Sequence, residues 1–526
     1  MMLSDDPQVL LPLIALYPEI HYRFKAFPLN RYFRSQPEII ADAPFRLEPG
    51  HALPVLLLVK DSDRFPIILE GVNIEAQGRE QYFRRHFSFG RELICKRWWH
   101  HIEWVELPDE SDCTWEINVT WRIQIADRHY NITNDNLPGL SHGPLKVRQS
   151  GQSLPRKDGW IFGDLHAHTS YTEDQVEFGA PLDAYYHLGQ ACGLSFSLTA
   201  DHSYDLDDLP GSFNENDPNL TRFKFRSAEI ARLNRDHQGA FSLIPGYELS
   251  VANDRGRNVH LLLLNQREFL PGSGDSAERW FHTRAEFSID EVIKKLKDEV
   301  LAVAAHPLMK PPLLQRLFLK RGSWKRKDLY NEKISALQIW NGQNGKDFRR
   351  GIETWVKGLL RGKRWKILAG SDAHGNFNRY RQVGFAMLRL KESDQHIFGQ
   401  VRTGVRLAGN LSPDNLTNSL KSAPSLVTDG PFAHLELKSQ QDGSMLAQVE
   451  ASSTSEFGEL STVRLYWGKK GEKAERTLQE GGIKGGYSAT LNSKIEDPNG
   501  YLRVEAITNA GRRALTNPLF LNGQTV

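Results

Sequence analysis

The stretch IFGDLHAHT, residues 161–169, decides the fold of this chain. We predict a strand over its apolar first half, residues 161–165, and His166 and His168 stand where that strand ends. Imidazole nitrogen is a ligand that suits zinc, manganese or iron. The stretch therefore predicts a metal site at the end of a strand.

Five further histidine and carboxylate motifs continue this pattern toward the C-terminus. They are Ala-Asp201-His202, Gly-Tyr-Glu248, Val-His260, Ala-His306-Pro and Ser-Asp372-Ala-His374. A cluster made only of protein ligands needs roughly four ligands per tetrahedral ion. The set therefore matches the ligand inventory of a hydrolytic site with two or three metal ions.

Short apolar strands alternate with helical stretches around these motifs. We expect strands at residues 161–165, 196–199, 241–245, 301–305, 336–340 and 367–369, and helices at 181–192 and 221–238. This alternation predicts a parallel sheet or barrel with helices outside. His166, Asp201, Glu248, His306 and Asp372 each follow closely on an expected strand. Barrel sites are built at such strand ends, so position and chemistry agree.

The regions on either side of this barrel have strand-like patterns. Residues 115–125 alternate apolar and polar side chains, which is typical of a half-buried strand, and residues 45–145 together favour a β-sandwich. Residues 136–157 are rich in Gly, Pro and Ser and are predicted to be a linker. After about residue 410, short strands between polar turns favour a second sandwich. We predict domains at 1–155, 156–410 and 411–526.

Composition sets modest limits on function. The 526 residues are 40% hydrophobic and 25% charged, which is ordinary for a globular protein, and a net charge of +2 says little about partners. The basic clusters at 320–327 and 361–366 are interpreted as solvated faces rather than phosphate-tracking patches. We find no strong nucleic-acid signal, and the oligomeric state stays open.

Cysteine usage and the N-terminus bear on the compartment. The three cysteines, Cys95, Cys113 and Cys192, are odd in number and show no CxxC spacing, so no disulfide framework is expected. Asp5 and Asp6 stand where a signal peptide needs positive charge, and no apolar run reaches the ~20 residues that span a membrane. We expect a cytoplasmic protein.

Taken in order, the motifs resemble those of the PHP (polymerase and histidinol phosphatase) family, which read DLHxHT, TxDH, GxE, VH, AHP and SDAH. The resemblance covers residues 160–410. The segments YTEDQVEFG (171–179), WNG (340–342) and VTDGP (427–431) resemble the carbaryl hydrolase-type branch of that family. The resemblance implies an α/β fold, a distorted (β/α)7 barrel flanked by N-terminal and C-terminal β-sandwich domains.

The resemblance also implies ligand sets for two or three divalent ions, which are zinc, manganese or iron. The first set is His166, His168, Glu248 and Asp372; Glu248 bridges to a second set with His260 and His306; and His202 and His374 belong to a third. The remaining ligand of the third ion is Glu173 or Asp174, of which we favour Asp174.

A carboxylate that bridges two dications holds them roughly 3.5–4 Å apart, where a shared water loses its proton near neutral pH. We expect from this a phosphoesterase that cleaves phosphate mono- or diesters, with carbamate, ester or amide hydrolysis as the alternative. The substrate is expected to be a small molecule.

Other residues near the motifs are candidates for catalysis or binding. Arg379 and Arg381 could clamp a phosphate, and Lys310 is another possible anion contact. Asp164 and Asp201 could each orient an imidazole, Asp201 could also bind metal, and a plain structural role is an alternative for both. Tyr171 and Trp340 could pack against the substrate or belong to the core.

A rival class of function is a binding module in which the barrel is a degenerate scaffold. Such a scaffold should have lost ligands, whereas the eight strongest ligand positions are intact in this sequence.

Overall fold

The computed structural model describes residues 36–110, 112–137, 140–172, 179–209, 215–276, 283–384, 389–441, 444–482 and 485–522. Strands account for 43% of the chain and helices for 15%, so the protein is mostly β, with several sheets. The chain divides into two compact units. The first comprises Met1–Ser153, Glu173–Gly193 and Ala373–Phe398, and the second comprises Leu154–Thr172, Leu194–Asp372 and Gly399–Val526.

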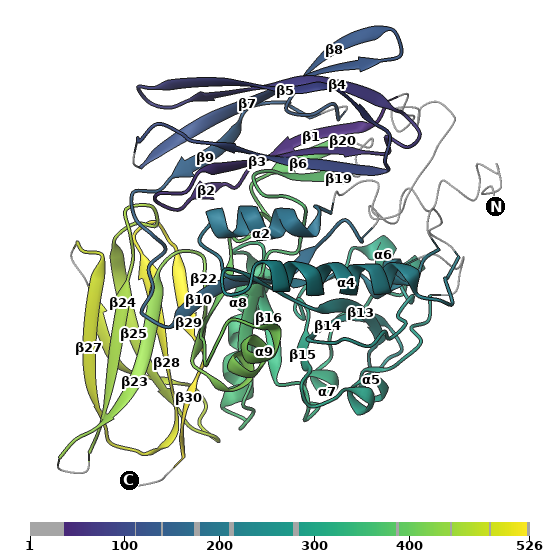
Figure 1. Ribbon diagram of the computed structural model, residues 1–526. Helices are drawn as coiled ribbons and strands as arrows, with labels where there is room; N and C mark the ends of the chain where they lie inside the picture. The colour runs from purple at the N-terminus through teal and green to yellow at the C-terminus, as the bar shows by residue number, and fades with distance from the viewer. Residues whose placement is uncertain are drawn as a thin grey trace. The chain divides into compact units, whose positions relative to one another are not determined.

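Two sheets that share one hydrophobic core form most of the first unit, as layers that face each other (Figure 1). One sheet has the order β1 (Glu38–Asp42), β3 (Leu53–Lys60), β6 (Trp98–Val105). The other has the order β2 (Arg46–Leu47), β9 (Leu145–Gln149), β7 (Cys113–Ile125), β4 (Ile67–Gln77), β5 (Tyr82–Ile94), with β8 (Arg128–Thr133) paired to β7. The unit also contains α2 (Leu182–Ala191), β18 (Ala373–His374), β19 (Tyr380–Gly384) and β20 (Arg389–Ser393).

Strand β7 has the alternation that its sequence predicts. Its apolar side chains from Trp115 to Ile123 are buried in the core, and the polar side chains between them are exposed or partly buried. Strand β9 corrects the prediction of a linker over 136–157. Leu145 and Val147 are fully buried in the same core, and β9 pairs with β7. Two core residues at period two therefore outweigh the Gly and Pro around them.

The second unit begins with β10, which contains the first histidine motif. Strands β10 (Trp160–His168), β11 (Phe196–Thr199) and β12 (Ser242–Ile244) pair in parallel. A five-stranded sheet follows, with the order β13 (Gly246–Ala252), β14 (Asn258–Leu264), β15 (Leu301–Ala304), β16 (Ala336–Asn341), β17 (Lys366–Gly370).

This five-stranded sheet is mixed, which corrects the expectation of a purely parallel one. Strands β15, β16 and β17 are parallel, but β13 and β14 form an antiparallel hairpin and β14 pairs antiparallel with β15. The connection over residues 253–257 is too short for the crossover that two parallel strands need.

Backbone hydrogen bonds join the five-stranded sheet, at both of its edge strands, to the sheet that contains β10. Asp372 N donates to His166 O at 2.7 Å beyond the end of β17, and Glu248 N donates to Asp201 O at 3.0 Å within β13. All four of these residues belong to the predicted ligand motifs. The motifs thus lie where one sheet meets the next.

Helices of the second unit are α3 (Ser203–Leu206), α4 (Thr221–Asp236), α5 (Ile289–Lys295), α6 (Leu313–Phe318), α7 (Arg326–Leu329), α8 (Lys346–Leu359) and α9 (Pro413–Ser422). Helix α8 packs closely on β16. A Cβ at Gly351 would lie 2.8 Å from the Cβ of Ile339, and the ring of Phe348 stacks on Trp340 at 4.1 Å between centroids. The absent side chain of Gly351 therefore allows the helix to approach the strand.

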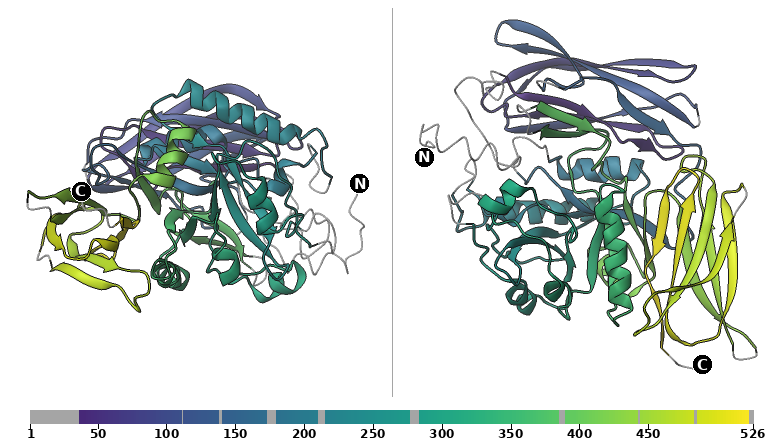
Figure 2. Two further views of the ribbon diagram at one scale, coloured as in Figure 1. Left: turned by 90° about the horizontal axis from the view of Figure 1, so that it is seen from below. Right: turned by 180° about the vertical axis from the view of Figure 1, so that it is seen from behind.

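Strands at the C-terminal end form a second sandwich, seen as facing yellow-green layers in Figure 2. One layer is β23 (Phe432–Ser439), β24 (Met445–Ser452) and β27 (Ser488–Ile495). The other is β25 (Leu460–Gly468), β26 (Arg476–Gly482), β28 (Asn499–Thr508), β29 (Arg513–Thr516) and β30 (Leu519–Asn522).

This second layer continues the sheet that contains β10. The sheet runs β12-β11-β10-β21-β22-β29-β28-β25-β26, through β21 (Arg402–Arg406) and β22 (Ser425–Thr428). One sheet therefore crosses the boundary predicted at residue 410, and the three predicted domain limits stay a prediction.

Among the described residues, the helices fall short of the length and hydropathy that crossing a bilayer requires.

Candidate metal centre

The centre starts from the two histidines of β10. His166 and His168 are two residues apart, so both side chains leave the same face of the strand. Both are fully buried, and their Nε2 atoms lie 3.2 Å apart. Gly370 of β17 makes room for them, because a Cβ there would lie 2.5 Å from His166 N and 2.6 Å from its Cβ.

Gln338 of β16 fixes the orientation of the His166 ring. His166 Nδ1 lies 2.9 Å from Gln338 Oε1, an oxygen that can only accept, so Nδ1 is the donor. In the neutral ring, Nε2 then presents its lone pair to the centre. The same oxygen accepts from His306 N at 3.3 Å. Gln338 also donates to Asn341 Oδ1 at 2.7 Å, and Asn341 donates to Asp372 Oδ2 at 3.0 Å.

Glu248 of β13 is buried between two groups of imidazoles. Its Oε2 lies 3.3 Å from His166 Nε2 and 3.5 Å from His168 Nε2. Its Oε1 lies 2.7 Å from His260 Nδ1 and 3.1 Å from His306 Nε2. One carboxylate thus presents a separate oxygen to each group, which is the arrangement that a bridging ligand needs.

Asp372 completes the first group from the loop after β17. Its Oδ1 lies 3.2 Å from Nε2 of both His166 and His168. Both Asp372 (φ 57°) and His306 (φ 29°) have left-handed backbone conformations, which non-glycine residues adopt rarely. Strain of this kind is concentrated at functional sites, where the surrounding structure enforces it.

Asp164 anchors the loop that carries Asp372. Its Oδ1 accepts hydrogen bonds from His166 N at 3.0 Å and Ser371 N at 2.9 Å, and its Oδ2 accepts one from Gly399 N at 2.9 Å. Burial raises the pKa of Asp164 despite these bonds. Asp164 therefore binds backbone amides, which matches the structural alternative given for it rather than the orientation of an imidazole.

The electrostatics of the cluster favour positive charge. Burial lowers the pKa of His166, but the carboxylates of Asp372 and Glu248 outweigh it and raise the pKa to about 9. Burial raises the pKa of Glu248, but His260 and His166 hold it well below its ordinary value. The buried carboxylates therefore stay ionised and attract cations.

The donor set fits two divalent ions. Ligand atoms within 4.8 Å of one another form one group from His166, His168, Glu248 and Asp372, and another from Glu248, His260 and His306. With Nδ1 of His166 donating to Gln338, lone pairs of nitrogen and oxygen converge on one point, and a cation there removes their mutual repulsion. Imidazole and carboxylate ligands suit zinc, manganese or iron.

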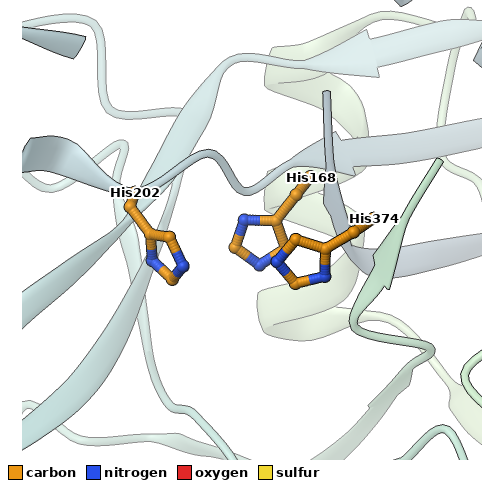
Figure 3. Close-up of side chains that lie close together, drawn as sticks. All are labelled: His168, His202 and His374. Atoms are coloured by element: carbon orange, nitrogen blue, oxygen red, sulfur yellow. The ribbon is translucent and has the colours of Figure 1, made fainter. Parts of the chain in front are cut away.

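The predicted third ion has weaker structural support. His202 follows β11; its Nδ1 lies 3.3 Å from Glu248 Oε2, and its ring lies beside that of His168 at 4.5 Å between centroids (Figure 3). His374 is buried in β18, which belongs to the first unit. Glu173 and Asp174 lie outside the described residues. The third ion stays a prediction.

The carboxylate of Asp201 supports the structure around the centre, which differs from the catalytic role we predicted for it. Arg226 of α4 donates to its Oδ2 at 2.5 Å, while Thr169 N and Thr172 Oγ1 donate to its Oδ1 at 2.6 and 3.1 Å. Burial raises the pKa of Asp201, but Arg226 outweighs it and keeps the pKa below its ordinary value. The carboxylate therefore holds the loop after His168, and both of its oxygens are engaged in doing so.

Arg379, one of the two arginines predicted to clamp a phosphate, has hydrogen-bond partners within the first unit. This guanidinium donates to Gly143 O at 3.0 Å and to Pro144 O at 2.9 Å, so it ties together two loops of the first unit. Arg381 lies in β19, and its side chain is outside the described part of the chain. The anion-binding role of these two arginines stays a prediction.

The remaining candidates separate into exposed and structural residues. Lys310 is exposed. Tyr171 donates to Glu229 Oε2 at 2.7 Å, and Trp340 is fully buried against α8. Within the basic cluster at 361–366, Lys363 donates to Tyr330 O at 2.6 Å and Lys366 is partly buried. Lys363 and Lys366 therefore have structural partners, which differs from the solvated face that was predicted for this cluster.

Four residues to which the sequence analysis gave no role here complete the centre. One of them, Arg321, belongs to the basic cluster at 320–327 that was predicted to be a solvated face, but it is mostly buried and paired with Asp275. Gln338 and Asn341 support the first group, and Asp275 and Arg321 contact His260 of the second. A small cavity beside them reaches His260 and His306. Asn341 follows Trp340 in the WNG segment that was noted in the sequence, but amide side chains carry no motif of their own.

Comparisons with known proteins find no matching family model and no matching curated protein. Solved structures that match include a β-glucuronidase of Bacteroides uniformis, a glycosyl hydrolase family 2 member of Bacteroides cellulosilyticus and a β-D-mannosidase of Dictyoglomus thermophilum. Their sequence identities are 9, 11 and 9%, and their TM-scores are 0.19, 0.18 and 0.18. Each alignment covers 92% of this chain and 60, 63 and 66% of those chains, respectively, so this chain spans about three fifths of the first two.

The predicted phosphoesterase is contradicted by this comparison, because these matching structures are glycoside hydrolases. We withdraw it. At TM-scores below 0.2, the likeness assigns neither a glycosidase activity nor a fold to this chain.

Proposed function

We propose that the chain is a metal-dependent hydrolase of the PHP type, with two divalent ions in a barrel formed by β10, β11 and β13–β17. Its substrate would be a small carbamate or ester. The observation that carries the proposal is the position of Glu248, whose two oxygens face two separate imidazole groups.

Each half of the proposed centre has its own ligands. His166, His168 and Asp372 with Oε2 of Glu248 would hold one ion, and His260 and His306 with Oε1 would hold the other. Divalent ions supply two effects there: they lower the pKa of a water molecule, and they stabilise negative charge that develops on the substrate. The protein side chains bind and orient, and their burial keeps bulk water from the ligand atoms.

The cavity beside His260 and His306 favours an uncharged substrate. Met309, Pro311 and Trp324 contribute apolar atoms to its lining. Arg321 also lines it, but its guanidinium is paired with the buried Asp275 at 2.8 Å. A lining whose cation is already neutralised suits a carbamate or ester better than a phosphate dianion.

Elemental analysis of protein purified without chelator tests the metal centre. We expect at least two divalent ions per chain, and we expect Glu248→Gln to lose ions from both halves. Glu480→Gln is the matched control, because Glu480 pairs with Arg464 on the surface of the C-terminal sandwich and should change nothing. Fewer than about one ion per wild-type chain would refute the proposal.

A substrate screen tests the reaction. Aryl carbamates, aryl esters, anilides, p-nitrophenyl glycosides and p-nitrophenyl phosphates are offered with zinc, manganese or iron. We expect turnover of a carbamate or ester that stops with chelator and returns with metal. Turnover of glycosides or phosphates alone would contradict the substrate class. Bound ions without any turnover would favour the rival function, a binding scaffold.

A further inference from the structure

A buried carboxylate contacts the second half of the centre from behind. Asp275 is fully buried in the segment after β14, and its Oδ2 lies 2.8 Å from His260 Nε2. Its other oxygen, Oδ1, accepts a short hydrogen bond from Ser250 Oγ. Asp275 and Ser250 lie outside the histidine motifs, so the sequence analysis did not identify them.

The protons on His260 follow from what each neighbour can do. An ionised carboxylate only accepts hydrogen bonds, so facing Asp275 places a proton on Nε2. Arg321 Nε and Ser250 Oγ also donate hydrogen bonds to this carboxyl group, as donors do to a carboxylate. The other ring nitrogen, Nδ1, faces Glu248 Oε1, 2.7 Å away, on the side of the centre, where a bound ion would take the Nδ1 lone pair in place of a proton. Asp275 thus selects the tautomer that can bind an ion through Nδ1.

Arg321 competes for the same ring nitrogen. Its Nη2 lies 3.1 Å from His260 Nε2, and its Nε donates to Asp275 Oδ2 at 2.8 Å. A guanidinium can only donate, so an Arg321 freed from Asp275 would donate to Nε2 and leave the proton on Nδ1. That tautomer would direct a proton at the ion position. Asp275 therefore both orients the ring and occupies the arginine.

We propose that Asp275 is the positioning residue of the second half of the centre, and that it acts by fixing the His260 tautomer against Arg321. This inference rests on the metal centre proposed above. Metal binding in the two halves then depends on different residues, because Gln338 orients His166 whereas Asp275 orients His260.

Three variants test the proposal through ion count and ion affinity, measured by elemental analysis and by titration with zinc. Asp275→Leu should lose one ion per chain, with the affinity of that ion reduced about 10- to 100-fold. Arg321→Met should keep both ions, because Asp275 still faces His260. The double variant Asp275→Leu/Arg321→Met should bind the weaker ion better than Asp275→Leu does, because the competing donor is gone.

The first half of the centre serves as the internal control for folding. A variant that keeps the ion of His166, His168 and Asp372 has retained its barrel, and the double variant avoids an unpaired buried arginine. Wild-type affinity for both ions in Asp275→Leu would overturn the proposal, as would a double variant that binds no better than the single one. Absence of ions from the wild-type chain would instead refute the metal centre itself.

Discussion

Nε2 of His166 lies 3.2 Å from Nε2 of His168 at the middle of the proposed metal centre. Nδ1 of His166 donates a hydrogen bond to Gln338 Oε1. In the neutral ring, Nε2 therefore turns its lone pair toward His168. Two such nitrogens this close, with carboxylates beside them, repel each other unless a cation or a proton lies between. Four predictions follow the contacts that hold this arrangement in place.

Gly370→Ala should disrupt the first half of the centre. The added Cβ would meet His166 N at 2.5 Å and the carbonyl carbon of Leu165 at 2.9 Å, and backbone cannot move aside as a flexible side chain can. We expect about 1–3 kcal/mol lower free energy of unfolding and loss of at least one ion, measured by denaturant titration and elemental analysis. Gly482→Ala is the control, since a Cβ there meets nothing within 4 Å. Equal behaviour of the two variants would show that the close packing is not required.

Gln338→Leu should weaken metal binding with little effect on the fold. The substitution removes the acceptor of His166 Nδ1 and the donor to Asn341, so both the imidazole and Asp372 lose their support. We expect a 10- to 100-fold lower affinity for the first ion, measured by zinc titration. Gln266→Leu loses one bond to Glu268 O away from the centre and should bind metal normally. Unchanged affinity in Gln338→Leu would argue that the ring is held by packing alone.

Arg226→Met should destabilise the protein strongly. It leaves the fully buried Asp201 without its ion-pair partner, which costs about 3–5 kcal/mol in comparable buried pairs. Arg232→Met on the same helix breaks an exposed pair with Asp236 and should cost about 0–1 kcal/mol. Denaturant titration compares the two. A small effect at Arg226 with a large loss of turnover would restore the catalytic role that the sequence suggested for Asp201.

Lys366 should give the protein a pH-dependent stability. Burial lowers its pKa from 10.5 to about 8, while its Nζ donates to Leu420 O and Ala423 O at the end of α9. Between pH 8 and 10.5 the unfolded chain binds a proton that the folded chain lacks, so stability rises with pH across this window. The rise should be about 1–3 kcal/mol.

Lys366→Met should flatten that rise, as measured by urea titrations at pH 8, 9 and 10. Lys357→Met, at an exposed position on α8, should leave it intact. A slope that is the same in all three proteins would place its origin at another group.

Short-range patterns predicted several strands between residues 160 and 410 well. Strand β11 and the expected 196–199 coincide, and α4 ends within two residues of the helix expected there. Period and apolar runs set these elements because each buries its own side chains. The proposed ligand residues stand out in the sequence because metal binding is restricted to a few residue types.

Long-range geometry could not be predicted in the same way. The β9 strand was taken for a linker because its burial depends on β7, some thirty residues earlier. Arg379 follows the SDAH motif closely, yet its guanidinium bonds to Gly143 and Pro144. Asp275 and Gln338 reach the ligand imidazoles only after folding. Roles that come from a partner far along the chain leave no local signal.

The sheet that runs from β12 to β26 also makes the proposed catalytic part inseparable from the C-terminal strands. Cutting the chain near residue 410 would strip β22 from β21 and leave an unpaired edge next to the strand that contains His166 and His168. Such an edge invites aggregation. A shortened chain for crystallisation or engineering should therefore retain all residues through β30. We also expect the second unit to unfold in a single thermal transition.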